Sequence, residues 1–134
     1  MLDALLAALS LPLLAATTNA CVGPTITNAV ATQAGTNGNL TSYDVAVTVK
    51  NTGSQAEPAS LLQSVQVYQD QTKVDQKGTQ PLAAGASTTV HYSFSRSSEA
   101  EQGSTHLHFR LVLKDPHGTA FSDCTPDSNY RLNV

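Results

Sequence analysis

The sequence contains no tryptophan and few charged residues, and each shortage disfavours particular classes of binding partner. Charged residues make up 13% of the 134 residues, with seven Lys and Arg against ten Asp and Glu. Nucleic acids and anionic lipids are bound by concentrated positive charge, so this composition disfavours both as partners. Tryptophan is the commonest stacking residue for sugars and bases, and its absence disfavours polysaccharide binding.

The sequence motifs of common enzymes are also absent. The chain has no Gly-x-Ser-x-Gly elbow, no Cys-x-x-Cys pair and no glycine-rich phosphate loop. Hydrolase chemistry needs a nucleophile, a base and an orienting group held in one cleft. A domain of about 110 residues with short strands leaves little room for such a cleft. We therefore expect a protein that is not an enzyme.

The one long hydrophobic run lies at the N-terminus. Residues 4–16 are uncharged and mostly Leu and Ala, and small residues at 18–20 precede a cysteine. A membrane-spanning helix needs about 20 such residues, whereas the core of a signal peptide needs roughly 7–15. We predict that residues 1–20 are a signal peptide cleaved before Cys21, although no Lys or Arg precedes the run. The alternative is a hydrophobic anchor or assembly helix that the protein retains.

The two cysteines, Cys21 and Cys124, lie near opposite ends of the remaining domain, residues 21–134. An even number of cysteines in an exported chain favours a disulfide bond. Closing a loop of about 100 residues stabilises the fold by about 4–5 kcal/mol in the chain-entropy model. Lipid modification of Cys21, two free thiols and metal ligation are the alternatives.

Alternation of apolar and polar residues is the dominant pattern after residue 20. Residues 43–50 place Tyr43 and three valines on one face and polar or small side chains on the other, and 51–53 end the run. A period of two is typical of a strand with one buried face. The same pattern, with Gly/Pro turns between, predicts strands at 25–32, 40–50, 61–69, 87–95, 105–114, 119–124 and 129–134, and a short pairing segment at Val74.

Turns are predicted between these strands at 33–39, 70–73, 76–78 and 115–118, where Gly, Pro, Asn and Asp gather. Seven or eight short strands without helical periodicity favour an all-β fold. The expected architecture is an immunoglobulin-like antiparallel β-sandwich, preceded by the hydrophobic N-terminal helix.

Residues 47–53 (VTVKNTG) have the pattern V-x-V-x-N-x-G, and residues 81–87 (PLAAGAS) contain Leu-x-x-Gly-x-Ser. These segments resemble the opening and a later turn of the CARDB family, cell-adhesion-related modules of bacteria and archaea. Residues 90–94, 111–116 and the Ser128-Asn129 pair resemble its later strands and ending. The resemblance covers roughly residues 25–134. It implies an immunoglobulin-like fold on an exported protein, and it carries no catalytic residues.

Histidines are the strongest candidates for a metal site. His106 and His108 are two residues apart on a predicted strand, which places both rings on one face about 6–7 Å apart. His91 lies on the outward face of its own strand and joins them if the two strands are neighbours. Imidazole nitrogens suit Zn²⁺ or Cu²⁺. The alternative is an ordinary polar stripe, in which Arg110 and Lys114 on the same face repel a cation.

Two further sites are suggested by single motifs. Oxygen ligands for Ca²⁺, which needs 6–8 of them, gather toward one end of the domain at Asp115, Asp123, Asp127 and Asn129. Asp and Asn are also common turn residues, so the same positions fit plain loops. Asn39-Leu40-Thr41 is a sequon for N-glycosylation of Asn39.

The sequence leaves three functions open. The first is a secreted, cell-surface or periplasmic module that binds a protein or cell-surface partner and mediates adhesion. The second is a subunit of an extracellular filament or envelope complex, with residues 1–20 retained and the edge strand 129–134 pairing with a neighbour. The third is a periplasmic metal-binding protein that uses the outward histidines. Contact with a membrane is expected only through residues 1–20.

Overall fold

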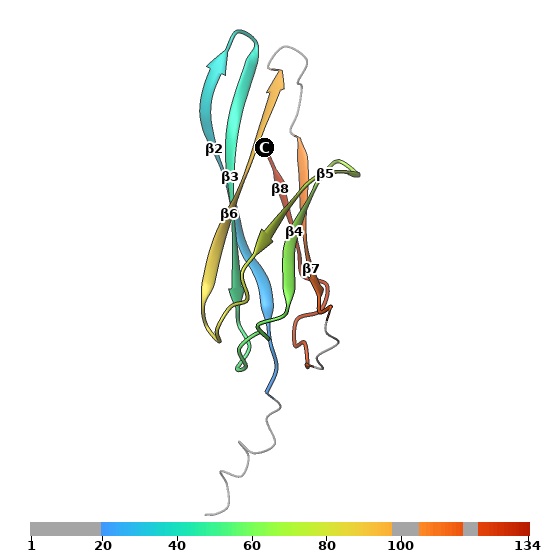
Figure 1. The fold of residues 1–134 in the computed structure, drawn as a ribbon. Coiled ribbons are helices and arrows are strands. Elements are labelled where there is room, and N and C mark those ends of the chain that lie inside the picture. Colours follow the sequence, from blue (N-terminus) through green and yellow to red (C-terminus); the bar gives the residue numbers. More distant parts are fainter. Residues whose placement is uncertain (1–19, 98–104, 117–120) are drawn as a thin grey trace, which may run out of the picture.

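The computed structural model describes residues 20–97, 105–116 and 121–134. In these residues seven strands form two antiparallel sheets (Figure 1). The first sheet has the order β2-β3-β6 and the second the order β5-β4-β7-β8. The strands of the first sheet are β2 (Pro24–Asn37), β3 (Leu40–Asn51) and β6 (Ser87–Ser97). Those of the second are β4 (Leu62–Gln69), β5 (Thr72–Thr79), β7 (His106–Lys114) and β8 (Asn129–Asn133).

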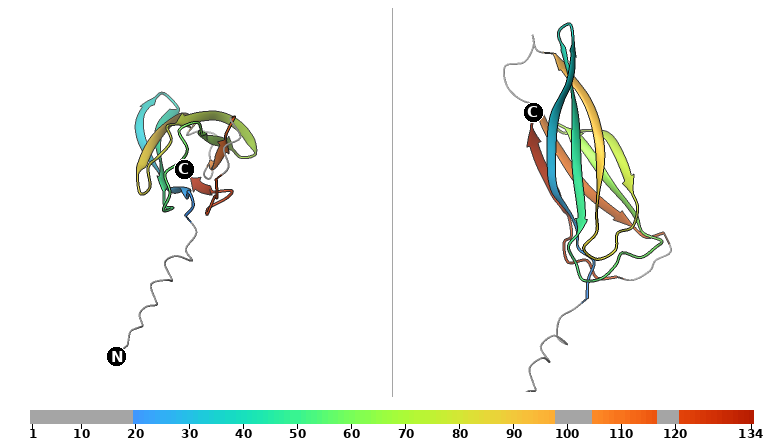
Figure 2. Two further views of the ribbon diagram at one scale, coloured as in Figure 1. Left: turned by 60° about the horizontal axis from the view of Figure 1, so that its bottom comes forward. Right: turned by 90° about the vertical axis from the view of Figure 1, so that its left-hand side faces the viewer.

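The two sheets share one hydrophobic core. Buried side chains alternate along β3, β4, β6 and β7, and the alternating sets from both sheets belong to a single cluster. The largest contribution comes from residues that are almost completely enclosed: Val45, Val47, Val49, Val65, Val67, Leu107 and Phe109. Along the two sides of the molecule, β2 lies against β8 and β5 lies against β6. Figure 2 shows the resulting elongated two-layer body from two further directions.

The predicted all-β antiparallel fold is therefore confirmed, and so are most strand positions. The strands expected at 40–50, 61–69, 87–95, 105–114 and 129–134 are β3, β4, β6, β7 and β8. The predicted inward faces also hold, because the valines of β3 and β4 are buried, as are Leu107, Phe109 and Leu111 of β7. Residues 1–19, 98–104 and 117–120 lie outside the described residues. The hydrophobic N-terminal helix and its cleavage thus stay predictions.

Several predicted boundaries are corrected. The loop expected at 33–39 is mostly strand, because β2 continues to Asn37 and turns only at Gly38 and Asn39. Gly38 has φ of 64°, as a two-residue hairpin loop requires. β5 takes in residues from both turns expected at 70–73 and 76–78, because pairing with β4 orders them. Val74, the predicted pairing segment, is instead the residue that the register shift beside Tyr68 leaves without a β4 partner. Of the strand expected at 119–124, the described part forms only an isolated bridge between Val22 and Asp123.

One end of the molecule is organised around Asn51, a fully buried amide at the end of β3. Its Oδ1 accepts hydrogen bonds from the backbone N–H groups of Gly23 (2.8 Å) and Gly53 (3.0 Å). Its Nδ2 donates to the carbonyl groups of Gln55 (2.8 Å) and Leu82 (3.2 Å). All four hydrogen-bonding positions of the side chain are therefore used. They join the chain entering the domain to two loops that are distant in sequence.

The disulfide closes the same end. Cys21 and Cys124 are bonded, with their Cα atoms 5.6 Å apart and a sequence separation of 103. The prediction of this pairing is confirmed, and the alternatives of lipidation and free thiols are excluded by it. Backbone hydrogen bonds flank the bond, from Val22 N to Ser122 O and from Cys124 N to Val22 O. These bonds hold residues 21–22 beside residues 122–124, the segment that precedes β8.

Candidate functional site

The outer face of the second sheet carries the candidate site. Leu107 and Phe109 of β7 are buried in the core, so the alternate residues His106, His108 and Arg110 point to the opposite side of the sheet. The strand register then fixes their neighbours. Tyr68 of β4 and Arg131 of β8 both pair with His108, one on each side. An aromatic ring, an imidazole and a guanidinium therefore form one row across three strands.

This row lines a shallow polar groove near the β4–β5 turn. One depression, of about 310 Å³, is lined by six residues: Tyr68, Asp70, Gln71, His108, Arg110 and Arg131. A second, of about 520 Å³, shares Asp70, Gln71 and Arg131 with it and adds Thr72 and His106. Because the two depressions share three residues, they adjoin. We call these eight residues the polar groove.

Hydrogen bonds hold the histidines of the polar groove in fixed positions. A ring nitrogen of His106 lies 2.7 Å from Oδ1 of Asn133, and Nε2 of His108 lies 2.6 Å from Oδ1 of Asn129. Asn129 is itself oriented, because its Nδ2 donates to the carbonyl of Asp127. The rings of His108 and Tyr68 are in contact, with centroids 5.8 Å apart. The groove walls are thus ordered before any ligand arrives.

The turn that ends the polar groove is fixed to β7. Asp70 has φ of 56°, a left-handed conformation that Asp and Asn tolerate better than most residues. Its backbone N–H donates to the carbonyl of His106 (2.9 Å). The Tyr68 hydroxyl donates to Oε1 of Gln66 (3.0 Å). These contacts keep the aromatic side chain and the Asp70 carboxylate on the same rim.

The charge on this face differs from that of the whole chain. The chain has a net charge of −3, yet four of its seven cations lie on the outer face of the second sheet: Lys73, Arg110, Lys114 and Arg131. Arg110 and Arg131 have no hydrogen-bond or ion-pair partner among the residues that the structure describes. Two exposed guanidinium groups in a groove therefore remain available to a ligand.

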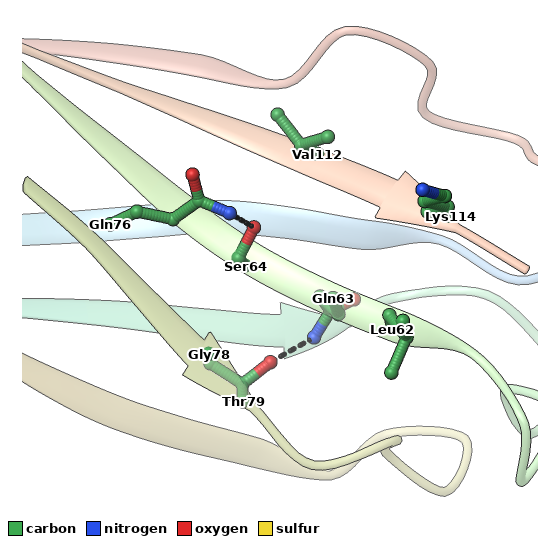
Figure 3. Close-up of a pocket in the computed structure, with 8 residues that line it drawn as sticks. All are labelled: Leu62, Gln63, Ser64, Gln76, Gly78, Thr79, Val112 and Lys114. Carbon is green, nitrogen blue, oxygen red and sulfur yellow. Dashed lines mark hydrogen bonds between the residues drawn. The ribbon is translucent and has the colours of Figure 1, made fainter. Parts of the chain in front are cut away.

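A more apolar pocket of about 300 Å³ lies on the same face, toward the other end of the sheet. Figure 3 shows its lining residues on three neighbouring strands, with Val112 and Lys114 on β7, Leu62 and Ser64 on β4, and Gln76 of β5 hydrogen-bonded to Ser64. Leu62 is 57% exposed, more than any other large hydrophobic side chain in the described residues. A partner covering the sheet would therefore meet both polar and apolar surface.

The structure does not bring the three predicted metal ligands together. His106 and His108 share one face of β7 as predicted, but His91 lies in β6, which belongs to the other sheet. His91 is exposed and its Nδ1 lies 3.0 Å from Oδ2 of Asp44. Within the described ranges, no group of three or more His, Cys, Asp and Glu is placed to hold a metal ion. His106 and His108 instead bond to the side chains of Asn133 and Asn129.

The predicted calcium ligands take part in turns. Asp115 accepts a hydrogen bond from Ser60 (3.1 Å), and Asp123 accepts one from the backbone of Thr125 (2.9 Å). Asn129 bonds to His108, as described above. Asn39, the predicted glycosylation site, lies exposed in the two-residue turn between β2 and β3. That position is accessible to a modifying enzyme, and whether modification occurs stays a prediction.

A buried acid, Glu57, lies in the loop beside Asn51. It is 6% exposed, and its Oε1 accepts a hydrogen bond from Leu82 N (2.8 Å). Its Oε2 is buried without a hydrogen-bond partner. Burial raises the pKa of Glu57, the hydrogen bond from Leu82 lowers it, and the negative charge of Asp123 raises it further; the net direction is upward. This position was not anticipated, because isolated acids in loops are usually solvated.

Sequence reasoning found the histidines but missed Tyr68, Asp70 and Arg131 as members of one site. The available signal was the alternation along 61–69, which puts Tyr68 on the face opposite to that of Val65 and Val67. The row through His108 depends on β7 lying between β4 and β8, and that order is not visible in any local pattern.

Comparisons with known proteins give one family match. The family model described as CARDB matches residues 24–116. No curated protein matches significantly. Among solved structures, one match is a candidate beta-galactosidase from Bacteroides fragilis, 19% identical, with a TM-score of 0.49. The match covers 84% of this chain but only 17% of that protein. Within the described part of this chain, no helix has the length and apolar character needed to cross a membrane.

Proposed function

Because the chain belongs to the CARDB family, we propose that it is a non-enzymatic binding and adhesion module that works outside the cytoplasm. The family match covers most of the described domain. In this proposal the two sheets form an immunoglobulin-like sandwich that presents one face to a partner protein or cell surface. The location is secreted, cell-surface or periplasmic.

The Cys21–Cys124 bond supports an oxidising compartment. Disulfides persist in secreted and periplasmic proteins and are rare where thiols are kept reduced. The bond is part of the fold, since it joins the first and last segments around the buried Asn51 junction. The domain is thus suited to an oxidising compartment, in which this bond persists.

The polar groove is the observation that carries the binding proposal. It combines Tyr68, two histidines and two unpaired arginines on ordered strands. Tyr and Arg are enriched among residues that dominate binding energy at protein interfaces. Because β-strands already fix the backbone of these residues, the entropy lost when a partner docks is mainly that of the side chains.

Saturable binding to cells tests this proposal. Isotopically labelled full-length protein, with its disulfide intact, is titrated onto intact cells of the source and competed with unlabelled protein. We expect saturable and competed binding, and none for protein that has been reduced and alkylated. Binding that rises linearly with concentration, or that unlabelled protein cannot displace, would contradict the proposed function.

Localisation is tested separately by the intact mass of the protein from its native source. Export with processing predicts a mass that corresponds to residues 21–134 with one disulfide. A retained N-terminus in that mass, together with concentration-dependent assembly in light scattering, would favour the filament subunit over the adhesion module.

A further inference from the structure

We propose that the polar groove binds an extended acidic segment of a partner protein, with Arg110 and Arg131 each pairing with a carboxylate. This inference rests on the proposed function and names the chemistry of the partner. Its basis is the concentration of positive charge on one face of a chain that is acidic overall.

The spacing of the two arginines matches an extended peptide. His108 pairs with Arg131 and Arg110 pairs with Asn129, so the two arginines are diagonal neighbours on adjoining strands. Diagonal positions of this kind lie about 7–8 Å apart. In an extended peptide, side chains two residues apart point the same way and lie about 6–7 Å apart. Acidic residues at alternate positions can therefore reach both guanidinium groups at once.

The groove is less suited to a sugar ring. Tyr68 is the one aromatic residue among the groove residues, and its ring is already in contact with that of His108. Recognition of a polysaccharide usually needs an open aromatic face on which the sugar stacks. Charge-assisted hydrogen bonds from Arg to carboxylate do not need that face, and their fork geometry fixes the orientation of the ligand.

The charge of Asp70 allows the preference of the groove for anions to be tested. Its exposed carboxylate lines both depressions beside Arg131 and opposes the binding of an anion. Replacing it with Asn keeps the shape and the tolerance for positive φ while removing the charge. A groove that binds carboxylates should therefore bind them more tightly in Asp70→Asn.

The experiment uses fluorescence anisotropy with an alternating threonine–glutamate nonapeptide as the probe. We expect binding that weakens as salt rises from roughly 0.05 to 0.3 M. Arg131→Gln and Arg110→Gln should each weaken it on the order of tenfold. Asp70→Asn should strengthen it by about two- to fivefold. Lys50→Gln, an equal change of charge on the other sheet, should leave it unchanged.

Control ligands distinguish an extended peptide with alternating acidic residues from other acidic ligands and from neutral peptides. A peptide of the same composition with its glutamates in one block, and one with glutamine in their place, should bind at least several-fold more weakly. Equal binding of the blocked peptide, or no effect of the two arginine substitutions, would overturn the inference. So would binding of polygalacturonate without binding of the peptide, because the partner would then be an acidic polysaccharide.

The cell-binding assay separates this inference from the proposed function. If labelled protein binds cells saturably and the Arg110→Gln/Arg131→Gln double variant binds equally well, the function stands and the acidic-segment inference fails. If no saturable binding is found for the unaltered protein, the proposed function itself fails, whatever the peptide does.

Discussion

Replacing Asn51 by alanine should destabilise the domain strongly, because the buried amide joins three segments of the chain. The side chain is completely buried and makes four hydrogen bonds to backbone groups. Truncation removes every one of them. The cost depends on which of the four partners can find a replacement.

The four partners differ in how well they are replaced. Gly23 N–H is buried and would lose its acceptor outright, at a cost of about 1–3 kcal/mol. Leu82 C=O would keep its hydrogen bond from Glu57 N, so its loss is small. The groups of Gly53 and Gln55 are only partly buried and can turn to water. Adding the cavity left by the side chain, we expect a loss of about 2–4 kcal/mol.

The measurement is urea unfolding of the oxidised protein, with Asn28→Ala on the exposed face of β2 as the matched control. A stability loss of 2–4 kcal/mol is a large part of the 5–15 kcal/mol typical of a domain, so the midpoint should move clearly. The control should change by less than about 0.5 kcal/mol. A change below about 1 kcal/mol in Asn51→Ala would refute the view that this amide holds the junction together.

Three more expectations use the same unfolding assay. Replacing both Cys21 and Cys124 by serine should cost about 3–5 kcal/mol, because the unfolded chain regains the freedom of a long loop; a variant as stable as the parent would contradict this. Gly53→Ala should cost about 1–3 kcal/mol, since a Cβ there would overlap the Cys21 carbonyl and lie 2.6 Å from Gly23 N, whereas Gly35→Ala meets nothing within 4 Å and should be tolerated. Glu57 has a raised pKa in the folded state, so its contribution to stability is greatest at low pH and is lost as pH rises above 4.5 through the raised value. Glu57→Gln should remove that loss, so that the stability of the variant relative to the parent protein is higher at pH 8 than at pH 4. A stability difference between variant and parent that does not vary with pH would count against a buried carboxyl.

Prediction from sequence worked where structure depends on near neighbours. The alternation of Val45, Val47 and Val49 with polar residues indicated a strand and its buried face, and both are observed. The motif at 47–53 likewise marked the end of that strand and the family. Prediction failed where distant pairing overrides local composition. Gly35 and Gly78 suggested turns, yet both lie in strands that a neighbouring strand holds in place.

The candidate site was only partly predictable for the same reason. That His106 and His108 share a face follows from the period of a strand. Which residues stand beside them depends on strand order, and the structure placed Arg131 and Tyr68 there and His91 in the other sheet.

The sequence alone determined the class of fold, the inward faces of the strands and the cysteine pair, since alternation, turn residues and residue counts are local properties. Only the tertiary structure decided the neighbours of β7, the four-way bonding of Asn51 and the gathering of two arginines in a groove. These depend on contacts between residues far apart in the chain, and long-range pairing is set by how the whole core packs rather than by any single segment.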